Sequence, residues 1–143
     1  MLVSESNLNN VLEDVYILDT GTYYFFEDFI ISEINEGLLF DWNMAQELIN
    51  LAENHYGKNN KVAYISNRVH SYSLVPQDWL KFFKARNSIS AFAVVSYNEK
   101  EKSDILIERL FFKSKIKKFF NLNDAVAWAS EQQREYNVKK TTA

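Results

Sequence analysis

The stretch KVAYISNRVHSYSLVP, residues 61–76, contains the transition on which the fold of this 143-residue chain depends. Its first part, residues 61–66, is a short apolar run of the kind that is buried in a parallel sheet. Pro76 fits the first position of a helix, and the following QDWLKFFKAR (77–86) continues at helical spacing. The stretch therefore predicts a strand, a polar connection and a helix.

Strands and a helix are also predicted on the N-terminal side of this stretch. The segments VYILD (15–19) and TYYFFEDFIISEI (22–34) are rich in β-branched and aromatic residues, which favours short antiparallel strands. Apolar residues then recur at helical spacing over residues 41–56. Asp41 is a suitable N-cap for this helix, and Gly57 stands where a C-cap glycine belongs.

The alternation of strands and helices continues on the C-terminal side. The run ISAFAVVS (89–96) has no charged residue and predicts a buried strand. A helix is expected from Asn98 to about Lys113, followed by a strand in KIKKFF (115–120) and a final helix capped by Asn121 or Asn123. Strands that alternate with helices require right-handed crossovers. The sequence thus predicts an α/β fold: one mostly parallel mixed sheet with an N-terminal antiparallel hairpin and about four helices.

The length and the polar ends predict the domain organisation. A chain of this length is the usual size of one domain. Residues 1–13 are polar and rich in asparagine, so we expect a flexible N-terminal arm, and residues 136–143 are expected to form a flexible tail. A single α/β domain is therefore predicted over residues 14–135.

The composition indicates the cellular compartment of the protein and excludes cysteine-based redox chemistry. No apolar run approaches the roughly 20 residues of a membrane span, and MLVSESNLNN (1–10) lacks the features of a signal peptide. The chain has no cysteine, so it has neither disulfides nor thiol chemistry. We expect a cytoplasmic protein without a transmembrane segment.

Charge is distributed unevenly along the chain. Residues 1–57 hold eleven acidic residues and no Lys or Arg, whereas residues 58–143 hold all sixteen basic residues and eight acidic ones. This polarity would orient a partner, including a second copy of the chain. Alternatively, the two halves neutralise each other within one fold.

The polar connection after residue 66 is the candidate binding or switch loop. Its candidate residues are Asn67, Arg68, His70, Ser71, Tyr72 and Ser73. Backbone amides at the start of the next helix favour an anion, to which Arg68 and His70 would add positive charge. The alternative is a loop whose side chains only satisfy their own backbone groups.

Catalytic and metal-binding patterns are missing from the sequence. The only histidines, His55 and His70, lack the spacing of a metal site, and three glycines are too few for a phosphate- or dinucleotide-binding loop. We therefore expect a protein that is not an enzyme and that has no metal and no cofactor.

Lysines form the sharpest basic cluster, in KSKIKK (113–118), at Lys113, Lys115, Lys117 and Lys118. The cluster is compatible with phosphate contacts, but the sequence pI of about 5.4 lacks the basic character of a nucleic-acid-binding domain. The lysines are also typical of residues that protect a sheet edge. No nucleic acid is expected as a partner.

The order of elements resembles that of STAS domains, in particular the SpoIIAA-like branch, which is related to the CRAL-TRIO lipid-binding domains. The closing segment KIKKFFNLNDAVAWASEQ (115–132) carries much of this resemblance, which covers roughly residues 12–134. In the anti-sigma-factor antagonists a phosphoacceptor serine lies after a central strand. The resemblance implies Ser71 or Ser73 as its equivalent, although no Asp precedes either serine and no Gly follows.

Three functions are therefore considered. The first is a non-enzymatic protein-interaction module in a bacterial regulatory pathway, as the resemblance implies, which binds a protein partner or, as a homodimer, itself. The second is a carrier of a small apolar ligand or lipid, and the third is a structural homo-oligomer. On the first hypothesis, alanine at Arg68 or Tyr72 is expected to weaken partner binding and to leave thermal stability little changed.

Overall fold

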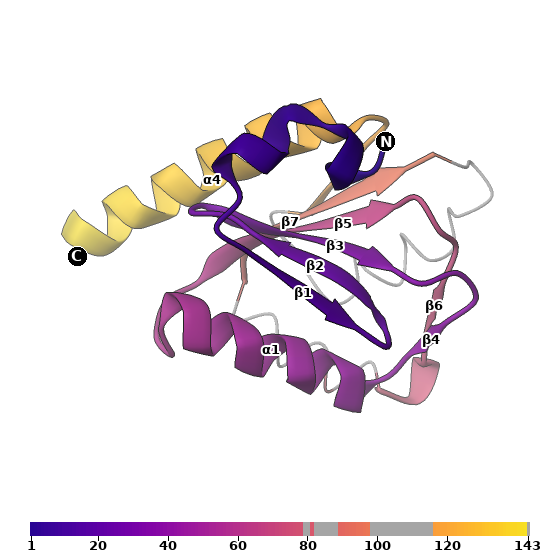
Figure 1. Ribbon diagram of the computed structural model, residues 1–143. Helices are drawn as coiled ribbons and strands as arrows, with labels where there is room; N and C mark the ends of the chain where they lie inside the picture. The colour runs from indigo at the N-terminus through magenta and orange to yellow at the C-terminus, as the bar shows by residue number, and fades with distance from the viewer. Residues whose placement is uncertain (79–80, 82–88, 98–115, 143) are drawn as a thin grey trace.

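The computed structural model describes residues 1–78, 81, 89–97 and 116–142. Within these residues a six-stranded sheet is covered by helical segments on both faces (Figure 1). The strands are β1 (Asp14–Leu18), β2 (Gly21–Phe25), β3 (Phe29–Ile34), β5 (Val62–Arg68), β7 (Ile89–Ser96) and β8 (Ile116–Phe119). The expected α/β architecture is confirmed.

The spatial order of the sheet is β1-β2-β3-β5-β7-β8. The pairs β1–β2 and β2–β3 are antiparallel, whereas β3–β5, β5–β7 and β7–β8 are parallel. The N-terminal antiparallel part and the mostly parallel remainder are therefore as predicted. In this arrangement the carboxyl ends of β3, β5 and β7 meet at one edge of the sheet, where ligands of open α/β sheets generally bind.

Helix α1 (Trp42–Tyr56) covers one face and has the predicted ends. The Asp41 side chain accepts a hydrogen bond from the Met44 N–H at 2.9 Å, which satisfies one of the first amides of the helix. At the other end Gly57 has φ of +100°, a backbone conformation that favours glycine. The buried side of α1, including Ala45 and Leu48, packs in one apolar cluster with Tyr23, Phe25 and Ile34 of the sheet.

Helix α4 (Leu122–Thr142) lies on the opposite face. Its cap is Asn121, whose side-chain oxygen accepts the Asp124 N–H at 2.9 Å, which decides between the two predicted caps. Leu122, Ala125 and Ala129 are buried against Ile31, Ile65 and other residues on this face of the sheet. The helix continues beyond the predicted boundary at residue 135, so the expected flexible tail is helical in the structure up to Thr142.

The first twelve residues, named here the N-terminal segment, also differ from the expectation of a flexible arm. They form two 3₁₀ helices, Val3–Glu5 and Asn7–Val11, which lie beside α4 on the same face of the sheet (Figure 1). Val3 is completely buried, and Leu8 and Leu12 pack against the same apolar cluster. The segment is ordered because these side chains cover part of the apolar surface of the antiparallel strands.

Two of the four expected helices lie partly or wholly outside the described residues. Of the helix predicted after Pro76, the structure describes a 3₁₀ turn at Pro76–Asp78 and helical Lys81, and the helix predicted from Asn98 to Lys113 falls wholly on residues 98–115. Among the described residues, the α-helices named α1 and α4 are both as predicted in position.

A small second sheet connects the strand ends to α1. It consists of the two-residue parallel strands β4 (Leu39–Phe40) and β6 (Ser73–Leu74), which the sequence analysis did not anticipate. The Ser73 N–H donates to the Leu38 carbonyl at 2.9 Å, and the Val75 N–H donates to the Phe40 carbonyl at 3.0 Å. These bonds fix the connection after β5 against the connection after β3.

Candidate functional site

The predicted binding loop begins later than expected, because β5 extends through Asn67 and Arg68. Alternate residues of a strand point to opposite faces, so Asn67 lies on the α4 side with Ile65, whereas Arg68 lies on the α1 side. Both side chains are buried, with exposed fractions of 1% and 3%. The sequence placed both residues in the polar loop, whereas the structure places them in the strand with buried side chains.

On the α1 side, Arg68 is packed against Tyr72, another residue of the predicted loop. Its guanidinium donates from Nη2 to the Tyr72 carbonyl at 2.8 Å, and its central carbon lies 4.3 Å from the centre of the Tyr72 ring. The Tyr72 hydroxyl is 3.0 Å from Ser66 Oγ, and the ring is buried. These contacts make Arg68 and Tyr72 part of the folded framework, which reverses the expectation that alanine there would leave stability little changed.

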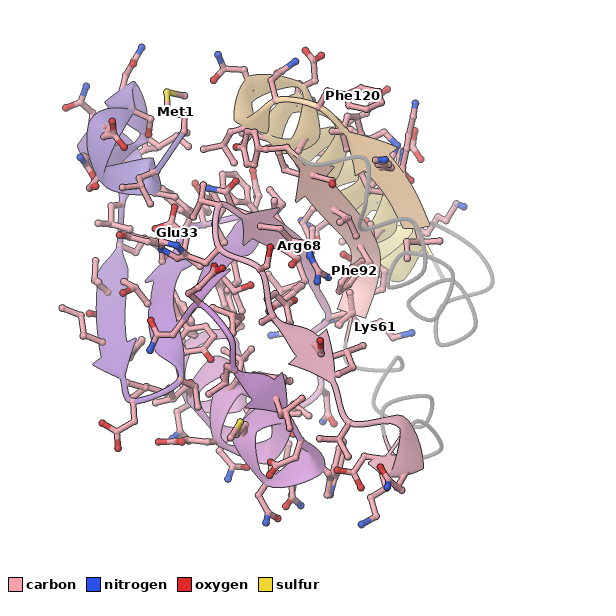
Figure 2. All side chains as sticks on the ribbon, turned by 90° about the vertical axis from the view of Figure 1, so that its right-hand side faces the viewer. Met1, Glu33, Lys61, Arg68, Phe92 and Phe120 are labelled. Carbon is pink, nitrogen blue, oxygen red and sulfur yellow. The ribbon has the colours of Figure 1, made fainter. Side chains whose placement is uncertain are left out.

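On the α4 side, Asn67 belongs to a buried polar network with Glu33 of β3. The Asn67 Nδ2 group donates to Glu33 Oε2 and to the Met1 carbonyl, each at 2.9 Å. The Val3 N–H donates to the same Glu33 oxygen at 2.8 Å, and the Tyr97 hydroxyl donates to Asn67 Oδ1 at 2.8 Å. Figure 2 labels Met1 in the N-terminal segment and Glu33 beneath it, at the end of the sheet.

Electrostatics in this network follow from burial. Glu33 is only 5% exposed, and its carboxylate accepts two hydrogen bonds that replace lost water contacts. Burial, together with the negative charge of Glu33, raises the pKa of Tyr97 to about 12, which extends to higher pH the range in which its hydroxyl is a donor. Sequence reasoning missed Glu33, although an acid within the apolar run FIISEI (29–34) was a detectable signal.

The accessible part of the predicted site is an outward-facing surface formed by β4, β6 and their preceding turns. We name it the β4–β6 corner and define it by Glu36, Leu39, His70, Ser71 and Ser73, all of which are exposed. The chain is extended here, so buried residues alternate with exposed ones: Phe40 and Tyr72 point inward with ring centroids 6.3 Å apart. The corner therefore presents one apolar side chain, Leu39, among polar ones.

The two candidate phosphoacceptors, Ser71 and Ser73, both lie on this corner. The Ser71 N–H donates to Glu36 Oε2 at 2.6 Å, and the Ser71 carbonyl accepts the Gly37 N–H at 2.7 Å. A phosphate on Ser71 would lie close to the Glu36 carboxylate and would be repelled by it. Phosphorylation of either serine stays a prediction.

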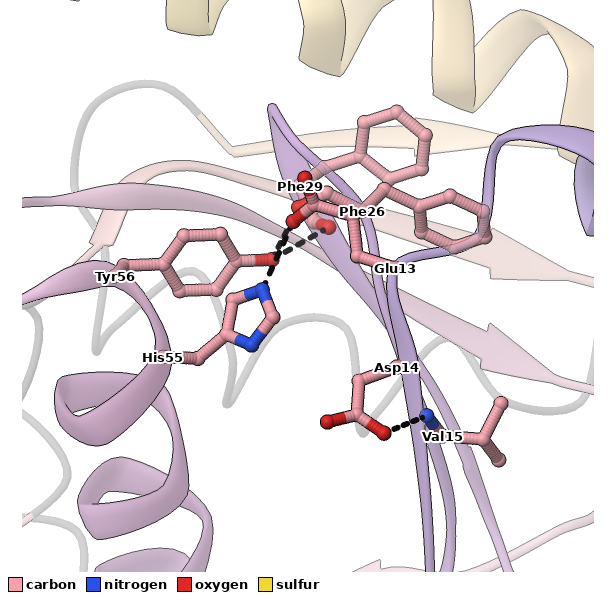
Figure 3. A network of polar contacts seen from close by, with 7 residues as sticks. All are labelled: Glu13, Asp14, Val15, Phe26, Phe29, His55 and Tyr56. Atoms are coloured by element: carbon pink, nitrogen blue, oxygen red, sulfur yellow. Dashed lines mark hydrogen bonds and ion pairs between the residues drawn. The ribbon is translucent and has the colours of Figure 1, made fainter.

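A second polar cluster joins the end of α1 to the start of the sheet (Figure 3). His55 Nε2 lies 2.8 Å from Glu13 Oε1, so this histidine forms an ion pair when protonated. The Tyr56 hydroxyl donates to the carbonyls of Phe26 and Phe29, and burial raises the pKa of this hydroxyl. Because every group in the cluster bonds to a neighbouring element, we assign it a structural role.

Among the described residues, His55 and His70 do not belong to a cluster of metal-ligating side chains. In the part of the chain that the structure describes, no three His, Cys, Asp or Glu side chains are grouped closely enough to hold a metal ion. In the same residues, no helix is long and apolar enough to cross a membrane.

Of the lysine cluster, Lys117 and Lys118 lie on β8, whereas Lys113 and Lys115 are outside the described residues.

Strand order and helix placement together define a SpoIIAA-like, or STAS, fold. The structural comparison confirms this class. An uncharacterized protein of the DUF3478 family from Shewanella loihica PV-4, whose crystal structure has a SpoIIAA-like fold, matches 81% of this chain and 90% of its own, with a TM-score of 0.50 and 12% sequence identity. No protein-family model matches the sequence, and no curated protein matches it. The likeness is therefore one of fold.

Proposed function

We propose that this chain is a non-enzymatic protein-interaction module in a bacterial regulatory pathway, with the β4–β6 corner as its contact surface. The observation that carries the proposal is the exposed apolar side chain of Leu39, which has 62% of its surface open to solvent in a ring of polar groups. An apolar centre with a polar rim is the usual composition of a protein interface. The regulatory setting rests on the SpoIIAA-like fold.

The corner is also held in place, which favours binding. The backbone bonds between β4 and β6, together with the bond from Ser71 to Glu36, fix the outward side chains relative to each other. Arg68 and Tyr72 support the corner from the inside. A surface that is already ordered loses less conformational entropy when a partner binds.

Substitution of Leu39 by aspartate is expected to weaken partner binding at least tenfold and to change the free energy of unfolding by less than about 0.5 kcal/mol, because the side chain is exposed. The matched control is Ile17→Asp, which places the same charge on another exposed apolar residue, in β1. The measurement compares partner recovery by tagged wild-type, L39D and I17D chains from the source cells. Equal recovery by L39D and wild type, or equal loss with I17D, contradicts the proposed surface.

Native mass spectrometry of the chain purified from its source cells separates this function from the alternatives. A bound protein, or a phosphate on Ser71 or Ser73, supports the interaction module. A bound lipid or other small molecule supports the carrier instead and counts against the corner as the working site.

A further inference from the structure

The buried network on the α4 side has the features of a peptide-binding site that is filled by the chain's own first residues. Three side chains, Glu33, Asn67 and Tyr97, form what we name the cradle. They come from the ends of β3 and β5 and from the residue after β7, and residues 1–3 lie across them. This site is distinct from the β4–β6 corner, and the inference does not rest on the proposed function.

The cradle contacts the backbone of the N-terminal segment in a defined pattern. Asn67 donates to the carbonyl of Met1, and Glu33 accepts the N–H of Val3, two residues later. Leu2 between them is extended, with φ of −70° and ψ of 149°. The Met1 carbonyl and the Val3 N–H therefore point to the same side of the chain. Side chains of the cradle thus take the place of a neighbouring β-strand.

Side-chain recognition accompanies these backbone contacts. Val3 has no exposed surface and belongs to the apolar cluster that contains Ile31, Ile65 and Leu122. The Tyr97 hydroxyl bonds to Asn67 Oδ1, and this bond orients the Asn67 amide with its donors toward Glu33 and Met1. The site therefore fits an extended peptide with an aliphatic residue two positions after the bound carbonyl.

We propose that the cradle is a peptide-binding site that exchanges its occupant between copies of this chain: the N-terminal segment of one molecule can bind the cradle of a second. The segment that fits is present in every copy. Only residues 12–13 connect the second 3₁₀ helix to β1, and a change in the direction of this short connection redirects the whole segment. In the wild type the cradle is occupied mainly by the segment of its own chain rather than by that of a second molecule. The reason is that the effective concentration of the tethered segment is in the millimolar range.

Two variants separate the segment from the cradle in the full-length chain. Val3→Asp disables the segment, because it places a carboxylate beside Glu33 in a buried position. Asn67→Asp disables the cradle with almost no change in volume, because it removes the donor to Met1 and sets two carboxylates against each other. Ser4→Asp is the control for the first variant and Asn59→Asp for the second, since both of these residues are exposed.

Chains of the V3D and N67D variants carrying different affinity tags are mixed and co-purified. The expected result is a mixed complex at least tenfold more abundant than either variant's complex with itself, because the intact segment of N67D enters the intact cradle of V3D. The S4D and N59D controls are expected to stay monomeric when mixed. Absence of the mixed complex between chains with native circular dichroism overturns the proposal.

A labelled synthetic peptide of residues 1–12 provides the second measurement, by fluorescence anisotropy. We expect it to bind the V3D chain at least tenfold more tightly than the wild type or S4D, and a peptide with Asp in place of Val3 is expected not to bind. If V3D does not fold, the nearly isosteric Val3→Thr takes its place, with tighter peptide binding than wild type still expected. Equal binding by the two peptides, or no binding by a folded variant, refutes exchange.

Discussion

Alanine in place of Arg68 is expected to lower the free energy of unfolding by about 2–4 kcal/mol, because the side chain is buried and bonded. The substitution removes the donor to the Tyr72 carbonyl and the cation that lies on the Tyr72 ring. It also leaves a cavity on the α1 side of β5, next to Tyr72, which supports the β4–β6 corner from the inside. Urea unfolding followed by tryptophan fluorescence measures the change.

The control for this prediction is His70→Ala. His70 is exposed and lies two residues away, so its replacement is expected to change stability by no more than about 0.5 kcal/mol. If R68A and H70A unfold at the same urea concentration, Arg68 does not have the structural role assigned to it. In that case the sequence-based expectation is retained, namely that alanine at Arg68 leaves stability little changed.

Gly21→Ala is expected to cost about 3 kcal/mol or more, or to prevent folding, because no space exists for a methyl group at this position. A Cβ atom on Gly21 would lie 2.5 Å from the Glu33 carbonyl oxygen and 2.8 Å from the Ile34 Cα. Both are backbone atoms of β3, which is paired on both sides and cannot move without breaking the sheet. The same displacement would shift Glu33, so the cradle would lose its geometry as well.

Gly37→Ala is the matched substitution for Gly21. Its φ of +75° strains an alanine, but no heavy atom lies within 4 Å of the added Cβ. The expected cost is therefore only about 1 kcal/mol, from backbone strain alone. Thermal and urea unfolding of the two variants measure the difference, and equal stabilities would show that β3 tolerates the contact.

Together these variants distinguish framework from contact surface. Arg68 and Gly21 lie beneath the molecular surface, and their replacement is expected to affect folding first. Leu39 lies on the surface, and its replacement is expected to affect binding while the fold persists. Binding assays on R68A or G21A are informative only together with a measurement of their stability.

Much of the fold follows from local signals in the sequence. Helix α1 begins after the cap at Asp41 and ends before Gly57, and the uncharged run 89–96 coincides with β7. The alternation of such elements was sufficient to predict an α/β fold with a mostly parallel sheet, because caps, turns and apolar periodicity act over a few residues. The SpoIIAA-like architecture was predicted from the resemblance of this order of elements to that of STAS domains.

The candidate site was predicted only in its position at the end of β5. Its exposed members, His70, Ser71 and Ser73, are where a loop would place them, whereas Asn67 and Arg68 continue the strand and are buried. A polar residue in a sequence favours a loop, and nothing nearby in the chain indicates otherwise. The partners that allow Asn67 to be buried are Met1, Glu33 and Tyr97, which are 66, 34 and 30 residues away.

Local preferences in the amino-acid sequence were therefore enough for the strands of the six-stranded sheet, for α1 and α4, and for their order, since each of these elements depends mainly on its own residues. The tertiary structure alone decided which polar side chains are buried, that the N-terminal segment packs on the core, and that β4 and β6 form the corner. The physical reason is that burying a polar group is tolerated only where its hydrogen bonds are satisfied. Those partners come together only when distant parts of the chain have folded against each other.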